Sequence, residues 1–496
     1  MKNKVFVSDS KKQFQTAFSL EFEKKPDVEE KVLNIHSDLR FQKVQGFGGA
    51  FTDSAAVTFS KMSEKSKKKF IELAFDKEKG LGYNFCRTTI NSCDFSEKEY
   101  TYVKNGDKTL ETFDIAHDKE NIIPMIKAAQ EKSDDLFLFS SPWSPPAFMK
   151  DSGNMIQGGK LKKEMYSVWA DYFVKFIKEY KKNGVKIDAV TVQNEPMAVQ
   201  TWESCVYTIE EQILFATDYL YPAFEKAGLD VKIAIWDHNK EHLYEVAKAI
   251  KADQKASERI FGIAFHWYSG EHYSELNFAH QTAPNMFLFA SEFCMCGCDS
   301  NWRFGLKYAY DMSGNFNNFM NASCDWNILL DENGGPYHNR STPCNAIVHY
   351  DTTKDKIMIM PQYYAVKHFS AFVKKGALRL GTSSWTDLIA ISAFENPNGD
   401  IVAVITSLAE REFECNLRLG DYMAPISVKP KSITTVLLVI YCGCLSSPKK
   451  KRATVPGPQC DEIIVPISNN LIFPSNCGIL RTISSIVSCP SSRQLA

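Results

Sequence analysis

The chain has 496 residues, of which 44% are hydrophobic and 24% charged, as in an ordinary globular protein with a large core. Its 58 Lys and Arg residues balance 59 Asp and Glu residues, and the net charge of −1 argues against a nucleic-acid-binding surface. Residues 1–15 lack an apolar segment of signal-peptide length and the longest apolar candidate, 436–441, is too short for a membrane helix, so the sequence as given predicts neither a secretory leader nor a transmembrane segment.

The first predicted elements are strands within residues 1–40. Apolar and polar residues alternate in "KVFVSDS", "FSLEFEKK" and "KVLNIHSD". A period of two is typical of half-buried antiparallel strands. We expect these strands to belong to an all-β side domain that a later part of the chain completes.

From residue 41 the pattern changes, and short apolar runs alternate with longer helical segments. Eight runs have strand character and end in polar or aromatic residues: 41–53, 81–90, 135–143, 186–195, 231–239, 261–268, 285–292 and 322–330. Alternating strands and helices predict a parallel sheet with right-handed crossovers. Eight such units favour an α/β fold of the (β/α)₈ TIM-barrel type over residues 41–375. No GxGxxG motif follows the first strand, which argues against a dinucleotide-binding sheet.

The helices between these strands carry clear signals. Apolar residues recur at helical spacing over 165–177, and Gly184 supplies a stop. Thr208 and Glu211 have the spacing of a capping box at the start of the next helix.

Strand patterns return after the barrel. They are "LRLGTSS", "LIAISAFEN", "DIVAVITS", "FECNLRL" and "SITTVLLVIY", all within residues 376–441. With the strands of 1–40 they predict a β-sandwich side domain. Residues 442–496 are rich in Ser, Pro and Cys and include the basic run "SPKKKR", and we expect them to form a poorly ordered tail.

In a parallel barrel, reacting groups collect at the C-terminal ends of the strands. The candidates at these ends are Asp53, Arg87, Trp143, Asn194, Glu195, Asp237, His266, Trp267, Tyr268, Glu292, Asp325 and Trp326. Glu195 and Glu292 end the fourth and seventh predicted strands, which face each other across a closed eight-stranded barrel. Two facing carboxyl groups predict a glycosidase, in which one acid protonates the leaving oxygen and one carboxylate attacks or activates water.

The neighbouring residue types agree with a sugar site. The indoles of Trp143, Trp267 and Trp326 offer flat apolar faces for sugar rings. Hydroxyl groups can hydrogen-bond to Asp53, Arg87 and Asn194. Taken singly, each candidate also has an ordinary structural explanation. A lone strand-end glutamate is more often a helix cap or an ion-pair partner, and a histidine such as His266 is more often a hydrogen-bonded structural residue. Arg87 would most simply pair with Asp53.

Other chemistries find little support in the sequence. Cys294, Cys296 and Cys298 in "CMCGC" have CxCxC spacing without a histidine in register, so we do not expect a structural zinc ion there. No phosphate-binding loop, Ser-His-Asp signature or dinucleotide fingerprint is present. A sugar-binding protein without turnover and a metal-dependent hydrolase remain as rival classes.

Several motifs together resemble a known family. They are "QGFGGAFTDSAA" (45–56), "SCDFS" (92–96), "SSPWSPPAFMK" (140–150), "QNEP" (193–196), "HWY" (266–268), "FASE" (289–292), "DWN" (325–327), "GGP" (334–336) and "HFSAF" (368–372). In this order they resemble glycoside hydrolase family 30, and within it the glucosylceramidases, over about residues 30–440. The resemblance implies a barrel with a β-sandwich and a retaining mechanism without a metal or other cofactor. The segment "YHNRSTPCNAIV" after "GGP" departs from the family pattern.

The resemblance also implies roles for individual residues. Glu195 matches the acid/base, whose pKa should then be raised, and Glu292 matches the nucleophile. The residues implied to bind substrate are Asp53, Arg87, Trp143, Asn194, His266, Tyr268 and Trp326. The implied substrate is a β-glucoside, above all a glucosphingolipid such as glucosylceramide, which would bring the protein into transient contact with a lipid surface. Within the same family, β-1,6-glucan hydrolysis and β-xylosidase action remain open.

Overall fold

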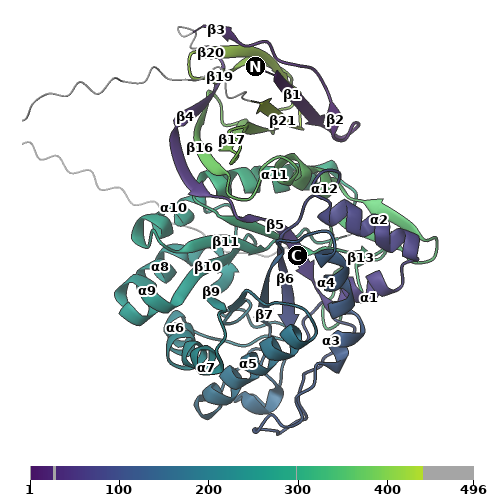
Figure 1. Ribbon diagram of the computed structural model, residues 1–496, viewed down its shortest axis with the longest axis vertical. Helices are drawn as coiled ribbons and strands as arrows, with labels where there is room; N and C mark the ends of the chain where they lie inside the picture. The colour runs from purple at the N-terminus through teal and green to yellow at the C-terminus, as the bar shows by residue number, and fades with distance from the viewer. Residues whose placement is uncertain (1, 26–29, 298, 440–496) are drawn as a thin grey trace, which may run out of the picture. The chain divides into compact units, whose positions relative to one another are not determined.

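The computed structural model of the protein describes residues 2–25, 30–297 and 299–439 (Figure 1). The predicted tail 442–496, its basic run, and Cys298 of the "CMCGC" motif lie outside the described residues. Within the described part of the chain, no helix combines the length and apolar character that crossing a membrane requires. The eight cysteines described there are all free thiols.

Eight parallel strands close into a barrel, and each of the eight predicted runs contributes one of them. In chain order they are β5 (Gly46–Phe51), β6 (Phe85–Ile90), β7 (Phe137–Pro142), β8 (Ala189–Thr191), β9 (Lys232–Asn239), β10 (Ile260–His266), β11 (Phe287–Glu292) and β12 (Ala322–Asn327). Strand β12 pairs with β5 and so closes the ring. The predicted TIM barrel is therefore confirmed.

Phenylalanine and small side chains together fill the interior of this ring. The cluster they form consists of Phe85, Phe139, Ala189, Ala234, Ala264, Phe289, Ala322 and Cys324, all buried. Where β5 meets β6 the backbones approach so closely that a Cβ atom on Gly48 would lie 1.7 Å from the carbonyl oxygen of Phe85. Gly48 of the "QGFGGAF" motif thus allows the first two strands to pack closely.

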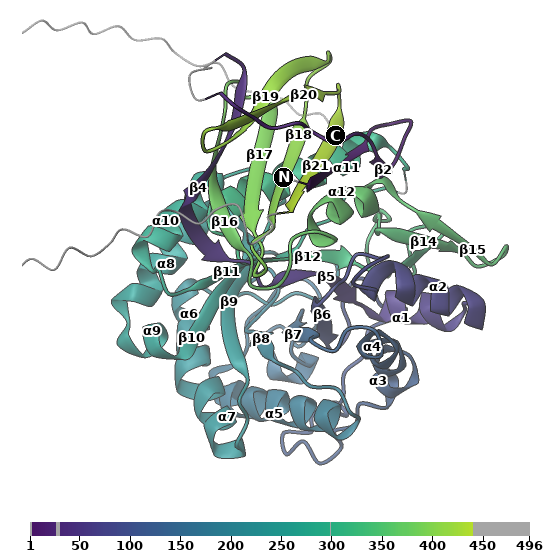
Figure 2. The ribbon, with the colours of Figure 1, turned by 45° about the horizontal axis from the view of Figure 1, so that its top comes forward.

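Helices follow the barrel strands and lie around them (Figure 2). Their bounds are α1 (Asp53–Ser60), α2 (Glu64–Phe75), α3 (Ala116–Glu120), α4 (Ile122–Gln130), α5 (Tyr166–Lys182), α6 (Ile209–Phe215), α7 (Tyr221–Ala227), α8 (Leu243–Ala252), α9 (Gln254–Arg259), α10 (Tyr273–Thr282), α11 (Trp302–Asn317) and α12 (Pro361–Ser370). The long helix α5 ends just before Gly184, whose φ is +81°. The predicted capping box of Thr208 and Glu211 begins α6.

The N-terminal and C-terminal strands join in one ten-stranded sheet, in the order β2-β1-β21-β18-β17-β16-β4-β19-β20-β3. The strands are β1 (Lys2–Ser8), β2 (Gln15–Thr16), β3 (Glu23–Lys24), β4 (Val32–Lys43), β16 (Leu378–Ser384), β17 (Ile389–Glu395), β18 (Ile401–Ser407), β19 (Phe413–Leu419), β20 (Tyr422–Val428) and β21 (Ser432–Val439). A buried aliphatic cluster of its own supports this sheet. The expected side domain built from both ends of the chain is confirmed.

Three features were not predicted. Strand β20 contains Pro425, which argues against a strand, but this residue lies opposite Asn416 of β19 in an antiparallel pair. A small three-stranded sheet of β13 (Leu330–Asp331), β14 (Val348–Asp351) and β15 (Lys356–Ile359) follows the last barrel strand. Strand β4 continues to Lys43, so the N-terminal part of the side sheet extends beyond residue 40.

Candidate active site

Both predicted glutamates line one cleft beyond the ends of the barrel strands. Glu195 follows β8, and Glu292 is the last residue of β11. The cleft has a volume of about 250 Å³, which suits a single sugar ring better than a drug-sized ligand. It is lined by Asp94, Trp143, Asn194, Glu195, Gln200, Trp202, His238, Asn239, Tyr268, Glu292, Cys294, Cys296, Trp326, Arg340 and Cys344.

Arg87 lies below the cleft and is fully buried. Its Nη1 atom donates to Oε2 of Glu292 at 2.8 Å, and its Nη2 atom donates to Oδ2 of Asp237 at 2.8 Å and to Oδ1 of Asn194 at 2.9 Å. The guanidinium plane also lies 4.6 Å from the ring centre of Trp143. The arginine therefore orients the nucleophile candidate and an indole together.

Asp237 is the second buried charge of this network. Besides Arg87 it accepts hydrogen bonds from the hydroxyl groups of Thr191 and Ser291, both at 2.6 Å. Burial opposes its ionisation, but the charge of Arg87 and the hydrogen bond from His266 outweigh burial and hold the pKa of Asp237 well below its usual value. Asp237 is therefore an ionised anchor rather than an acid.

His266, the last residue of β10, connects Asp237 to both glutamates. Its Nε2 atom lies 3.0 Å from Oδ1 of Asp237 and must donate, because an ionised carboxylate only accepts. Its Nδ1 atom lies 3.1 Å from Oε1 of Glu195, and its Nε2 atom lies 4.0 Å from Oε2 of Glu292. A single imidazole ring thus lies close to both carboxyl groups, which brings them together in one site.

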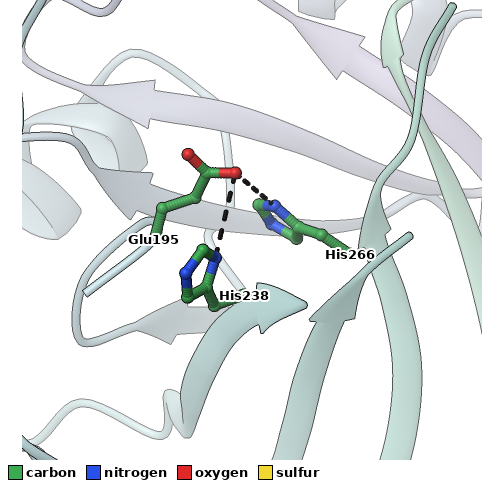
Figure 3. Close-up of side chains that lie close together, drawn as sticks. All are labelled: Glu195, His238 and His266. Carbon is green, nitrogen blue, oxygen red and sulfur yellow. Dashed lines mark hydrogen bonds and ion pairs between the residues drawn. The ribbon is translucent and has the colours of Figure 1, made fainter. Parts of the chain in front are cut away.

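The loop after β8 carries Glu195 in an unusual backbone conformation. The φ angle of this residue is +46°, and its amide donates to the carbonyl oxygen of Asp237 at 2.9 Å. Left-handed φ values in non-glycine residues are uncommon and cluster at functional sites. Figure 3 shows Oε1 of Glu195 directed toward both His266 and His238, with Nδ1 of His238 at 3.9 Å.

The pKa values of Glu195, His266 and Glu292 depend on one another's charges, on burial and on nearby charged groups. Burial and the charge of Glu195 raise the pKa of Glu292, although His266 and Arg87 oppose the shift. Burial lowers the proton affinity of His266, but the charge of Glu292 and the bonds to Asp237 and Glu195 outweigh it and raise the pKa of His266 to about 9. Burial acts to raise the pKa of Glu195, but the hydrogen bond from His266 and its charge leave this pKa below the usual value.

The expectation that the pKa of Glu195 is raised is therefore wrong for the free protein. The proton shared by Glu195 and His266 resides on the imidazole, because three carboxylates surround that ring. The two groups form one proton-holding pair, joined by a hydrogen bond of 3.1 Å.

The aromatic candidates Trp143, Trp326 and Tyr268 also line the cleft. Trp143 and Trp326 stack with ring centres 5.0 Å apart, and both line the cleft. Tyr268 is 42% exposed and donates its hydroxyl to Oε1 of Glu292 at 2.9 Å. These rings supply an apolar face beside a carboxylate held by two donors, Arg87 and Tyr268.

Three of the barrel strands contain β-bulges near the site. Asp237 in β9, Ser291 in β11 and Trp326 in β12 are each an extra residue that has no partner in the pairing with an adjacent strand. Trp236 and Asp237 have φ values of +76° and +53°. Because a bulge changes which face the following side chains occupy, the bulges re-aim side chains toward the cleft.

Asp53, Arg87 and His266 are not among the residues that line the cleft, but unlike Arg87 and His266, Asp53 has no hydrogen bond to either glutamate. It begins α1, is 1% exposed, and its carboxylate bonds to Nε2 of His117 at 2.9 Å and to the amide of Glu97 at 3.1 Å. The predicted pairing of Arg87 with Asp53 is also wrong, since Arg87 pairs with Asp237 and Glu292. Asp53 is the first residue of α1, and in the free protein its carboxylate is engaged by His117 and Glu97.

Sequence reasoning missed several residues of the cleft. Asp94 lies in the "SCDFS" motif and forms an ion pair with Arg340, which comes from the segment that departs from the family pattern. Burial raises the pKa of Asp94 to about 7, even though Arg340 opposes the shift. His238 and Gln200 also line the cleft. His238 directly follows a predicted strand-end residue, whereas Gln200 and Arg340 lie in loops, where no local pattern marks them.

Comparison with known families agrees with this architecture. The glycosyl hydrolase family 30 TIM-barrel domain matches residues 44–373, and the glycosyl hydrolase family 30 β-sandwich domain matches residues 376–436. The lysosomal acid glucosylceramidase of Mus musculus is 32% identical over 404 residues, which cover 77% of this chain and 78% of that protein. The putative glucosylceramidase 3 of Caenorhabditis elegans is 32% identical over 432 residues, covering 82% and 81%.

Solved structures show the same relationship. SrfJ from Salmonella typhimurium superposes with a TM-score of 0.86 at 34% identity and covers 89% of this chain and 100% of its own. An endo-β1,6-glucanase superposes with a TM-score of 0.80 at 26% identity, with the same coverage. The similarity therefore extends over both the barrel and the side sheet.

Proposed function

The chain belongs to glycosyl hydrolase family 30 and is a glycoside hydrolase, and we propose that it cleaves β-glucosides by a retaining double displacement. The observation that carries the proposal is the shared network below the cleft. Glu292 accepts from Arg87 and Tyr268, while Glu195 bonds to His266, so the two carboxyl groups have different partners within one site. Different environments for two carboxyl groups are what separate a nucleophile from an acid/base.

In the first step Glu292 attacks the anomeric carbon. Two donors orient its carboxylate, and the stacked pair Trp143–Trp326 supplies an apolar wall beside the ring. Glu195 delivers a proton to the leaving oxygen and draws on the proton that it shares with His266. Asn194, whose carbonyl oxygen is engaged by Arg87, is then free to donate its amide to a sugar hydroxyl.

In the second step water releases the sugar. The ester at Glu292 no longer carries the charge that raised the pKa of His266. The pair of Glu195 and His266, which has lost its proton to the leaving group, accepts one from the attacking water. Both displacements invert the anomeric carbon, so the product keeps the β configuration.

We assign glucosylceramide as the preferred substrate. Support comes from the glucosylceramidases among the relatives and from the rim of the cleft, where the loop after Glu195 exposes Met197 to 56% and Val199 to 61%. Exposed apolar side chains beside the acid/base suit a lipid aglycone and a transient lipid contact. The second candidate, β-1,6-glucan hydrolysis, is favoured by the structural similarity to an endo-β1,6-glucanase.

The experiment compares the full chain with Glu195→Gln and Glu292→Gln, and with the exposed-residue control Glu414→Gln. Each protein is assayed on an aryl β-glucoside, on glucosylceramide in detergent micelles and on a β-1,6-linked gluco-oligosaccharide. Both site variants should lose about 10³-fold or more in kcat on their preferred substrate, while the control should not. The relative kcat/KM values decide between the two substrate classes.

Stereochemistry provides an independent check. Proton NMR of the first-formed sugar should show the β-anomer before mutarotation. If the first-formed sugar is the α-anomer, the reaction is a single displacement and the retaining mechanism is refuted. Wild-type turnover in both glutamine variants would refute the assignment of Glu195 and Glu292.

A further inference from the structure

Three donor atoms converge at the acid/base: Oε1 of Glu195, Nδ1 of His238 and Nδ1 of His266 (Figure 3). Each of these atoms lies within 4.8 Å of the other two. We propose that they form an inhibitory binding site for a d-block dication, with Zn²⁺ as the representative ion. The site combines two imidazoles and one carboxylate, a ligand set that zinc accepts while it keeps a fourth position for water.

The distances suit such an ion. Nδ1 of His266 lies 3.1 Å from Oε1 of Glu195, and Nδ1 of His238 lies 3.9 Å from the same oxygen. Zinc bonds of about 2.0–2.2 Å in tetrahedral geometry place neighbouring ligand atoms about 3.3–3.5 Å apart. The distance from Glu195 to His266 is slightly below this spacing and the distance from Glu195 to His238 slightly above it, while all three atoms lie within 4.8 Å of one another.

His266 has the second contact that metal-binding histidines usually make. Its Nε2 atom donates to Asp237, which is itself held by Arg87 and two hydroxyl groups. A carboxylate on one ring nitrogen fixes the ring and leaves the other nitrogen for the metal. On binding, the metal takes the place of the proton between His266 and Glu195, and that proton is released to solvent.

His238 supplies an observation independent of the acid/base pair. Its Nδ1 atom is buried and makes no hydrogen bond to any described residue. Buried polar atoms are rarely left unpaired, so this nitrogen is available to a ligand that enters the cleft. The bulge at Asp237 aligns His238 with the cleft, and the histidine lines it beside Glu195 and Asn239.

The charge of the site also favours a dication. Three carboxylates, Glu195, Asp237 and Glu292, meet one guanidinium, Arg87, within the same hydrogen-bonded network. With both imidazoles neutral, as metal ligands must be, the cluster carries two negative charges, which one dication neutralises.

The inhibitory effect rests on the proposed function of Glu195. A carboxylate bound to a metal through Oε1 cannot share a proton with His266, so it cannot protonate the leaving oxygen. Zinc should therefore lower kcat reversibly without unfolding the protein.

A second group of donors in the cleft must be distinguished. Cys294 and Cys344 lie with their sulfur atoms 3.5 Å apart, and the exposed Cys296 pairs with Cys344 across an isolated bridge. Thiolates also bind zinc, so the matched control is Cys296→Ser. Cobalt(II), used as a second probe, reports thiolate ligation through a ligand-to-metal charge-transfer band.

The test is calorimetric titration of the full-length protein with zinc chloride, for the wild type, His238→Asn, His238→Gln and Cys296→Ser. We expect one zinc per chain in the wild type, at least about tenfold weaker binding in both His238 variants, and unchanged binding in Cys296→Ser. The cobalt complex should lack a thiolate band. Zinc should inhibit aryl β-glucoside hydrolysis, and a chelator should restore the activity. Inhibition is measured relative to each protein's own zinc-free rate. The zinc concentration needed for half inhibition should rise in the His238 variants by the same factor as their dissociation constant for zinc.

The outcomes separate the two proposals. Absence of saturable binding in the wild type, wild-type affinity in both His238 variants, or loss of binding in Cys296→Ser would each overturn the site. Circular dichroism identifies a variant that fails to fold, and the other His238 variant then decides. Stoichiometric binding at His238 without inhibition would keep the metal site and reject Glu195 as the acid/base.

Discussion

Arg87 contacts residues from four other barrel strands or the loops that follow them. Its side chain donates to Ser141, to the carbonyl oxygen of Ser291, and to Glu292, Asn194 and Asp237. All five hydrogen-bonding directions of a planar guanidinium are needed for this arrangement, and a lysine ammonium cannot reproduce them. The residue therefore couples the orientation of the nucleophile to the stability of the barrel mouth.

Arg87→Lys keeps the charge and tests this geometry. We expect kcat/KM to fall by about 10²-fold or more, and the free energy of unfolding by about 3 kcal/mol, because Asp237 and Glu292 lose paired donors in a buried site. The measurements are steady-state kinetics and urea unfolding. The control is Arg40→Lys, whose ion pair with Glu395 is half exposed. Wild-type kinetics in Arg87→Lys would show that the charge alone suffices.

Asp325 illustrates a buried acid outside the catalytic pair. Its Oδ1 atom accepts from the hydroxyl of Tyr308 at 2.9 Å, and its Oδ2 atom has no hydrogen-bond partner among the described residues. Burial raises the pKa of Asp325 from 3.8 to about 8, so the folded protein holds this group neutral. The folded state then binds a proton that the unfolded state releases above pH 3.8.

Because the unfolded state loses this proton at lower pH than the folded state does, the contribution of Asp325 to the free energy of unfolding decreases as the pH rises from about 4 to 8. The slope is at most about 1.4 kcal/mol per pH unit for one proton. Asp325→Asn mimics the neutral acid and should flatten this decrease. The check is a series of urea unfolding curves from pH 4 to 8. An unchanged slope would mean that Asp325 is ionised in the fold.

At the scale of elements, the bulges in β9, β11 and β12 control what the strands present to the cleft. A strand with strict alternation would place Asp237 and His238 on opposite faces, yet Asp237 joins the buried network and His238 lines the cleft. The left-handed φ of Trp236 and Asp237 makes this possible. The contact between β5 and β6 constrains the sequence in another way. The two backbones lie so close at Gly48 that no side chain fits there.

Gly48→Ala tests that closure. The added Cβ would meet the carbonyl oxygen of Phe85 at 1.7 Å, a backbone atom that cannot rotate away, so β5 and β6 must separate. We expect a loss of about 4 kcal/mol or more in unfolding free energy. Gly49→Ala is the matched control, since its Cβ would lie 3.1 Å from the Ile328 side chain. Equal losses in thermal or urea unfolding would show that the backbone contact is not the cause.

At the scale of the whole molecule, the barrel and the side sheet share buried polar contacts. His368 of α12 lies 2.8 Å from the hydroxyl of Ser8 in β1 and 2.8 Å from that of Thr435 in β21. Burial lowers the pKa of His368 to about 3, so the ring is neutral in the fold. One histidine thus ties a barrel helix to strands from both ends of the chain.

The lowered pKa of His368 predicts a loss of stability in acid. Between pH 6.5 and about 3 the unfolded state takes up a proton that the folded state refuses, so the stabilising contribution falls as the pH falls. His368→Gln keeps polar atoms for both hydroxyl groups and should make the acid-side decrease in Tm shallower than in the wild type. The exposed His272→Gln is the control. Identical acid-side slopes for His368→Gln and wild type would reject the prediction.

Local patterns in the sequence determined the architecture. The alternation of apolar runs with amphipathic helices predicted all eight barrel strands, and the capping box at Thr208 marked the start of α6, because strand and helix periods are written in neighbouring residues. Glu195 and Glu292 were found for the same reason, since a strand end is a local feature that the barrel topology turns into a position at the mouth. Strand β20 was not predicted because it contains Pro425. Whether a strand tolerates a proline depends on its pairing with the partner strand, here β19, which the local sequence does not show.

Tertiary structure alone decided the partners of the charged groups. Arg87 meets Asp237 and Glu292 rather than Asp53, since register shifts between distant strands determine which side chains enter the site. The proton resides on His266 rather than Glu195 because three carboxylates converge on one ring, an electrostatic sum over residues far apart in the chain. Interaction energies between charges fall with distance in space, and distance in space is set only when the barrel closes.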